Sequence, residues 1–304
     1  MRSSNIGGQA VLEGIMMRNG DKYSVAVRKP DGEIAVDVQE YHSILPWKKP
    51  LKIPFVRGIF NFIDSLVLGM KTLMYSASFF EEEEGQSLSE EEAAKQEKKE
   101  KIIMNLTVVV SVILAAALFM LLPYMLSMFM ARFTSSRIVL TIFEGVIRLA
   151  IFLIYIFLIS QTKDIKRTFM YHGAEHKCIN CIEHGLELTV DNVRKSSKQH
   201  KRCGTSFLFF VMVVSIVFCF FITAQSQALR VLIRLALLPL IASVSYEIIR
   251  LAGNSENPFI NLLSKPGMWV QNMTTKEPDD SMIEVAICAV EEVFDWREWQ
   301  RENQ

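Results

Sequence analysis

Residues 102–131 read IIMNLTVVVSVILAAALFMLLPYMLSMFMA, 30 residues without a formal charge. In helical form this stretch is long enough to cross a hydrocarbon core of about 30 Å, for which about 20 residues suffice. Three later segments are also long and largely apolar, and a soluble core explains one such segment but hardly four. We therefore expect an integral membrane protein with about four transmembrane helices. The four segments are residues 102–131, 138–162, 204–227 and 229–251.

The composition of the 304-residue chain agrees with this class. Half of the residues are apolar, with 20 Phe and 15 Met, and 33 Lys+Arg balance 33 Asp+Glu to a formal net charge of zero. This balance excludes a disordered chain, a small disulfide-rich scaffold and a nucleic-acid-binding protein driven by bulk charge. The lipid bilayer is therefore the first expected partner, and no nucleic acid is expected.

Basic residues predict the orientation. Residues 163–203 hold nine Lys and Arg, whereas the connection 132–137 holds two. Positive residues favour the cytoplasmic side, so both termini are expected in the cytoplasm of a multi-pass protein of the cell membrane. Residues 1–54 contain no apolar stretch of signal-peptide length, which agrees with a cytoplasmic N-terminus. The large polar segments then share one side and can build one site.

Two patterns stand out in the N-terminal polar region. Residues 23–38 alternate between apolar and polar around the turn signal Pro30-Asp31-Gly32, which predicts a β-hairpin. Residues 55–80 have helical apolar spacing, but charges such as Asp64 make a membrane span improbable. We expect an amphipathic helix that lies at the membrane interface or packs on the bundle.

Near the C-terminus, Ser281 and Glu284 resemble a capping box that opens one apolar-periodic helix to about Trp299. The expected fold is thus an α-helical integral membrane protein with a small α+β cytoplasmic domain and one amphipathic interfacial helix. Its expected parts are a hairpin segment (1–54), the amphipathic helix (55–80), a charged linker (81–101), two spans (102–131, 138–162), a cytoplasmic His/Cys loop (163–203), two more spans (204–227, 229–251) and a C-terminal segment (252–304).

Four of the five histidines lie within 29 residues of the basic loop. On a helix, His172 and His176 are one turn apart, so both imidazoles can reach one metal ion. Glu175 stands between them in the pattern H-x-x-E-H, the inverted zincin signature, in which the glutamate acts as a base. His200 and Cys203 offer a further nitrogen and sulfur. Two clusters with two ligands each predict a metal site.

Other interpretations of these residues remain open. The histidines and cysteines could simply pack or hydrogen-bond, or could act in catalysis without a metal. Within the spans, Glu144 and Arg148 are spaced i, i+4 and are expected to pair. Glu247 could pair with Arg250 or point toward the histidine loop. These alternatives depend on the tertiary fold.

Taken together, several motifs resemble the bacterial DUF1385 family of YqhQ-like membrane proteins, over nearly the whole chain. The motifs are GGQAVLEGIMMR (7–18), RGIFNFIDSLVLGMKTL (57–73), YHGAEHKCI (171–179), HKRCGTSFLF (200–209), SYEIIR (245–250) and PGMWVQNMTTKEPDDSMIEVAICA (266–289). The resemblance implies a predicted metal-dependent enzyme.

The resemblance also implies particular site residues. Its two central motifs carry His172, Glu175, His176, His200 and Cys203, and its N-terminal motif carries Glu13. One departure is Lys201, where the family usually has proline, which should change local rigidity but not the ligands. Three further candidates lie outside the core pattern and are not included in the ligand set: Cys178, Cys181 and His184.

The leading hypothesis is a membrane-embedded, metal-dependent hydrolase with its site at the cytoplasmic face. Zinc is expected because mixed His and Cys ligands in the cytoplasm suit it, although another divalent metal is an alternative. His172, His176, His200 and Cys203 would bind it, and Glu175 and Glu13 would be catalytic. The alternative is a non-catalytic scaffold or membrane-protein biogenesis factor that binds other membrane proteins and has a structural metal. A transporter ranks third, and neither substrate nor oligomeric state is predicted.

Overall fold

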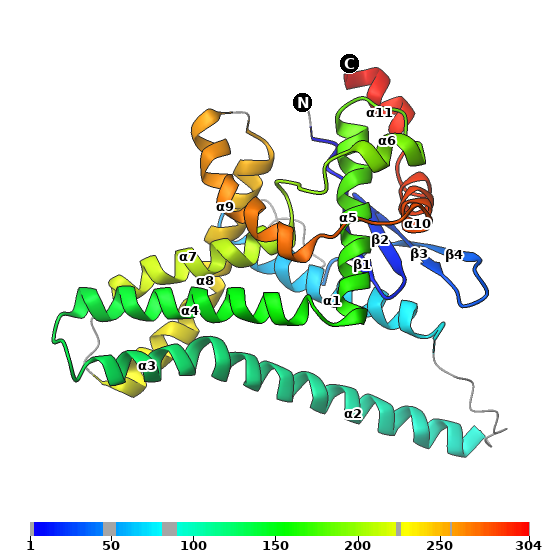
Figure 1. The fold of residues 1–304 in the computed structure, drawn as a ribbon. Helices are drawn as coiled ribbons and strands as arrows, with labels where there is room; N and C mark the ends of the chain where they lie inside the picture. The colour runs from blue at the N-terminus through cyan, green and yellow to red at the C-terminus, as the bar shows by residue number, and fades with distance from the viewer. Residues whose placement is uncertain (1–2, 45–52, 81–89, 223–225, 256, 304) are drawn as a thin grey trace. The chain divides into compact units, whose positions relative to one another are not determined.

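The computed structural model in Figure 1 describes residues 3–44, 53–80, 90–222, 226–255 and 257–303. The chain forms two compact units, one of residues 1–80 and 156–304 and the other of residues 81–155. Residues 81–89, the start of the expected charged linker, lie outside the described part. The helices of the first unit are α1 (Arg57–Ala77), α5 (Lys163–Glu183), α6 (Val190–Lys195), α7 (Gly204–Phe220), α8 (Gln227–Gly253), α9 (Pro258–Thr274), α10 (Asp280–Glu291) and α11 (Trp296–Asn303).

The first unit is built on a four-stranded antiparallel sheet with the strand order β1-β2-β3-β4. The hairpin predicted from the alternation of residues 23–38 is the β3–β4 pair. Gly32 in its turn has a φ of 89°, which favours glycine. The first hairpin was not predicted, because its glycine-rich start lacks the apolar alternation of a half-buried strand. The strands are β1 (Gly7–Val11), β2 (Gly14–Asn19), β3 (Lys22–Arg28) and β4 (Ile34–Glu40).

Helices cover both faces of the sheet. On one face, α5 and α10 lie side by side, and Ile15 and Met17 of β2 join a buried cluster with Ile179 and Ile283. On the other face, Leu68 of α1 packs in a second cluster with strand residues. Because side chains alternate along β2, this strand contributes residues to both clusters. The first cluster packs α5 against the N-terminal hairpin.

Helix α1 is amphipathic in an unusual sense, because its buried face is rich in small and polar residues. Asp64 is 5% exposed and accepts hydrogen bonds from the Tyr41 hydroxyl (2.6 Å), the Ser43 hydroxyl (2.6 Å) and the Ile44 amide (2.9 Å). Its large apolar side chains point outward instead. The exposed ones are Ile63, Leu66, Val67, Met70, Leu73 and Met74.

Three helices in the described part of the chain are long and apolar enough to cross a membrane, which supports a membrane protein. The count of four spans is not confirmed. Helix α7, expected as the third span over residues 204–227, is an apolar helix of 17 residues, and at 1.5 Å per residue it rises only about 26 Å. The three candidates are Ile102–Met130, Arg137–Ile159 and Leu229–Gly253.

The second unit contains the first two candidate spans. Glu144 and Arg148 pair at 2.7 Å as predicted, and both side chains are 8% exposed. Pro123 lies just after a π-helical turn, where a proline can be accommodated because the local hydrogen bonding is already irregular. The elements are α2 (Glu90–Ala116), η2 (Ala117–Leu121), α3 (Leu122–Met130) and α4 (Arg137–Ile159), and α4 runs on into the first unit.

Glu247 has a hydrogen-bonded partner that neither interpretation named. Its carboxylate binds the guanidinium of Arg57, which opens α1, rather than Arg250 or the histidine loop. Next to this pair, Gly58 lets α1 approach Ser243 of α8 closely. The sequence could not indicate a pair whose members are separated by 190 positions.

The C-terminal segment also differs from the single helix expected after Ser281. Asp279, not Ser281, caps α10 by accepting from the Met282 amide at 3.0 Å. Asp295 then accepts from the Glu298 amide at 2.9 Å at the start of α11, so a second capping residue divides the apolar pattern into two helices. Helix α9 was not predicted, since the internal Pro266 weakens a helical pattern.

Candidate metal site beside the N-terminal strand

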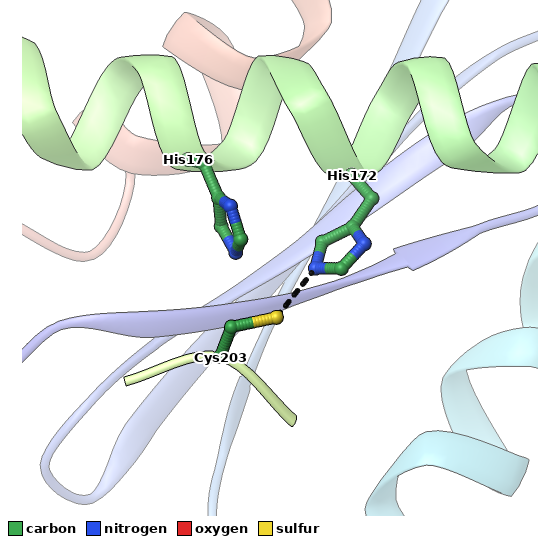
Figure 2. A group of neighbouring side chains, drawn as sticks. All are labelled: His172, His176 and Cys203. Carbon is green, nitrogen blue, oxygen red and sulfur yellow. Dashed lines mark hydrogen bonds between the residues drawn. The ribbon is translucent and has the colours of Figure 1, made fainter. Parts of the chain in front are cut away.

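Three potential metal ligands converge in the first unit: His172, His176 and Cys203. Figure 2 shows both imidazoles projecting from one face of α5 toward the sulfur of Cys203, which lies just before α7. The three ligand atoms lie within 4.8 Å of one another, and the His172 Nε2 atom is 3.3 Å from the Cys203 sulfur. Residues 31 positions apart in the chain thus meet at one point.

Backbone carbonyls orient both imidazoles. The His172 Nδ1 atom donates to the carbonyl oxygen of Thr274 at 2.9 Å, and the His176 Nδ1 atom donates to that of Lys198 at 2.7 Å. Because a carbonyl only accepts, each Nδ1 carries the hydrogen and each Nε2 faces the shared centre. This is the arrangement found behind most histidine metal ligands, where the second ring nitrogen is held by a hydrogen bond.

The electrostatics favour a thiolate at Cys203. Burial by itself raises the pKa of this thiol, but the positive charges of His172 and His176 hold it well below its ordinary value. Burial likewise lowers the pKa of His172, yet the Cys203 sulfur raises it to about 9. The Cys203 sulfur also accepts from the Thr205 amide at 3.4 Å at the N-terminus of α7. A metal bound here would displace the proton on His172 Nε2.

Glu175 lines the same small cavity of about 90 Å³ as the three candidate ligands. Burial raises the pKa of its carboxyl, while His176 and His172 act in the opposite direction. The backbone amide of Gly8 donates to this carboxylate. A Cβ at position 8 would lie 2.6 Å from the Met16 carbonyl and 3.0 Å from the Glu175 carboxyl carbon, so only glycine permits this close approach.

His200 lies beside the cluster but outside the three-residue group. Its ring centroid is 5.8 Å from that of His176, while its Nε2 atom faces Glu183 at 3.3 Å. Burial lowers the pKa of His200, while the contact with Glu183 acts in the opposite direction. Its assignment as a metal ligand therefore stays a prediction, one that requires the ring to turn away from Glu183.

Glu183 was not recognised as a site residue, yet it connects three segments. It accepts from the Ser4 amide (2.7 Å) and hydroxyl (2.8 Å) and from Arg202 (2.6 Å), and it also contacts His200. Burial alone raises the pKa of Glu183, but His200 and Arg202 lower it to about 2. Glu183 thereby ties the N-terminus to the loop that carries Cys203.

Changing Glu183 to glutamine should destabilise the first unit at neutral pH. A carboxyl whose folded pKa is lowered from 4.5 to about 2 stabilises the fold above about pH 4.5, and this stability is lost as the pH falls toward 2. The shift corresponds to about 3 kcal/mol. Urea unfolding in detergent at pH 7 and pH 3 should show a deficit in the variant that shrinks at pH 3. The exposed Glu187→Gln serves as the control, and an equal deficit at both pH values would contradict the assignment.

The C-terminal end of α9 positions the site, and only the family resemblance had indicated it. Gln271 is fully buried; it accepts from the His200 amide at 2.9 Å and donates to the His200 carbonyl at 2.8 Å and the Ser206 hydroxyl at 2.7 Å. Gln271 thus fixes the loop before α7. Three residues further along the chain, the Thr274 carbonyl orients His172. The sequence signal that could have indicated this role is an amide side chain, Gln271, in an apolar helix.

Glu13, expected to be catalytic, does not line this cavity. In the β1–β2 turn, at a φ of 49°, its carboxylate forms two 2.5 Å bonds with Arg167 and accepts from Tyr171 at 3.2 Å. It therefore joins the N-terminal hairpin to α5, and its catalytic role stays a prediction. Cys178 and Cys181 are buried in the sheet–helix core, outside the three-residue group.

Comparison with known proteins places the chain in a family. Residues 53–296 match a family described as "Protein of unknown function (DUF1385)". The "Uncharacterized protein YqhQ" of Bacillus subtilis (strain 168) is 36% identical over 306 residues, which cover 98% of this chain and 95% of the relative. No solved structure matches the chain. With a match over most of its length, the chain belongs to the DUF1385 family.

Proposed function

We propose that this protein is a membrane-bound, metal-dependent hydrolase whose site is the His172–His176–Cys203 group. The observation that carries the proposal is the convergence of these ligand atoms within 4.8 Å, with both Nε2 atoms directed inward by backbone carbonyls. Zinc is the proposed metal, because two imidazoles and one thiolate suit it. Three protein ligands also leave a fourth position open, as in catalytic zinc sites.

When bound, zinc would supply Lewis acidity and lower the pKa of a water molecule at that open position. Glu175 is the proposed general base, because its carboxylate lines the same enclosed cavity. Its burial raises its pKa, which brings a carboxylate closer to the range in which it exchanges protons at neutral pH. In the hydrolysis, Glu175 takes the proton of the attacking water and returns it to the leaving group.

The contacts around Cys203 support a location of the metal-ligand cluster at the end of the apolar helices. Cys203 directly precedes α7, and the side chain of Arg202 packs against Gly253, the last residue of α8. Since α8 contains a candidate span, the cluster lies near one end of that span. The basic residues of 163–203 favour the cytoplasmic face for this end.

A structural metal in a non-catalytic scaffold is the alternative. It requires a closed shell with a fourth protein ligand, for which His200 is a candidate, with its ring centroid 5.8 Å from that of His176. Its contact with Glu183 favours the open site instead. X-ray absorption of the zinc-loaded protein distinguishes the two, because a third nitrogen ligand from histidine would favour the scaffold.

Changing Glu175 to glutamine should abolish hydrolysis while zinc stays bound. The amide keeps the shape of the side chain but cannot accept the proton, and loss of a general base lowers turnover by about 100-fold or more. The measurement pairs zinc content with turnover on a panel of activated esters, amides and phosphodiesters in detergent. Exposed Glu187→Gln is the control. Full turnover in Glu175→Gln, or absence of zinc from the wild type, would exclude the proposal.

A further inference from the structure

The cavity at the metal ligands is too small for a whole substrate. Its volume of about 90 Å³ holds a few water molecules or one reacting group. A larger cavity of about 520 Å³ lies on the other side of the N-terminal strand, and Gly7 and Gly8 line both spaces. The body of a substrate can occupy this larger groove while its reacting group reaches the cavity.

Helix α1 forms the opposite wall of this groove through Ser65 and Leu68. Ser65 lies on the same helical face as Gly58, Gly69 and Thr72, all of which are buried, yet Ser65 itself is exposed. The groove opens at this point of an otherwise packed face. It is therefore a gap between the sheet and α1 and not an ordinary surface depression.

The lining of the groove suits an anion. Arg18 is the charged residue among the described residues that line it, and the other polar residues of the lining include Asn5, Gln9 and Asn19. The guanidinium of Arg18 stacks on the Tyr41 ring at 3.3 Å from the centroid, which limits its motion. A planar cation held in place favours phosphate or carboxylate.

Helix α1 also connects the groove to lipid. Its outer face exposes large apolar side chains, with Leu66 at 53% and Val67 at 52%. The helix begins against α8, a candidate membrane span, through the Arg57–Glu247 pair and the hydrogen bond from Asn61 to Tyr246. An exposed apolar face that continues from a membrane span lies in the bilayer interface.

We propose that the groove between β1 and α1 binds the headgroup of an anionic membrane lipid, with Arg18 as its charged contact. The lipid approaches from the bilayer beside α1, and the headgroup extends past Gly7 and Gly8 toward Glu175. This inference rests on the proposed function for the chemistry at the cavity, but binding in the groove does not itself need the metal.

The test uses the full-length protein in detergent micelles and native mass spectrometry. Phosphatidylglycerol is the probe, phosphatidylcholine the uncharged comparison and inorganic phosphate the competitor. We expect one phosphatidylglycerol per chain, retained in preference to phosphatidylcholine and not displaced by phosphate. Arg18→Gln should lower its affinity about tenfold or more, because a charge-assisted contact is lost, and Arg301→Gln, an exposed charge in α11, should not.

Gly7 provides a second, steric test. A Cβ at this position meets nothing within 4 Å, so Gly7→Trp fills the groove and should remove lipid binding, whereas Gly7→Ala should retain it. Retained lipid in Gly7→Trp, equal retention of phosphatidylcholine, or displacement by inorganic phosphate would each overturn the proposal. Cys203→Ser separates the two hypotheses, since it should lose zinc and keep the lipid. Zinc content in every variant reports whether the site is intact.

Discussion

Changing Cys203 to serine is expected to remove stoichiometric zinc from the purified protein. The thiolate supplies one of three candidate ligands within 4.8 Å, and a serine hydroxyl of similar size stays protonated at neutral pH. Changes behind a metal ligand already weaken binding by about 10–100-fold, so loss of the ligand itself should cost more than about 100-fold. Elemental analysis after dialysis against a weak chelator measures the effect.

Cys288→Ser is the matched control, because Cys288 lies in α10 and outside the cluster. It should retain zinc like the wild type, while His172→Ala should behave like Cys203→Ser. If Cys203→Ser and His172→Ala both kept full zinc, the metal would be bound elsewhere and the proposed site would be wrong.

Changing Gly173 to alanine is expected to destabilise the first unit, although alanine is the better helix former. A Cβ at position 173 would overlap the carbonyl oxygen of Lys276, so α5 and the segment after α9 would have to separate. That separation strains the 2.8 Å bond from the Lys276 amide to Phe169 and the contact between His172 and Thr274. We expect a net loss of about 2 kcal/mol despite a helix-propensity gain of about 1 kcal/mol.

Urea unfolding in detergent and zinc affinity are the two measurements for this variant. Both should fall in Gly173→Ala, since the carbonyl that orients His172 moves away. Gly204→Ala is the control in the same neighbourhood, because a Cβ at the start of α7 meets nothing within 4 Å. A Gly173→Ala protein as stable as the wild type, with unchanged zinc affinity, would show that the close approach is not needed.

Part of the candidate site could be predicted locally. The spacing of His172 and His176 on one helix places both imidazoles on one face, and this follows from helical periodicity alone. Cys203 could be nominated by residue type, but its distance from His172 depends on how α5 and α7 pack. The role of Gly173 was invisible, because its neighbour Lys276 is about 100 positions away and a glycine in a helix has many explanations.

Other features also depended on more than local sequence. Glu247 and Arg250 are close together on one helix, which suggested that they pair. The hydrogen bonds of Glu247 come instead from Arg57 at the start of α1. The uncharged residues after Gly204 predicted a full membrane span, and this span stays a prediction, because α7 ends at Phe220 and hydropathy does not locate the end of a helix. Glu183 went unrecognised because its three partners come from the N-terminus and the loop before α7.

The segment expected as a His/Cys loop contains the helix α5, which only the structure shows. The sequence by itself determined the class of protein, the long apolar helices, the β3–β4 hairpin and, for a helical segment, the shared face of His172 and His176. Each of these depends on hydropathy or on periodicity within one element, which neighbouring residues specify. Only the tertiary structure decided that Cys203 joins the two histidines, that His200 faces Glu183 and that Gly8 contacts Glu175. These contacts join separate segments, and the packing of α5 against the sheet and the C-terminal segment sets which side chains meet.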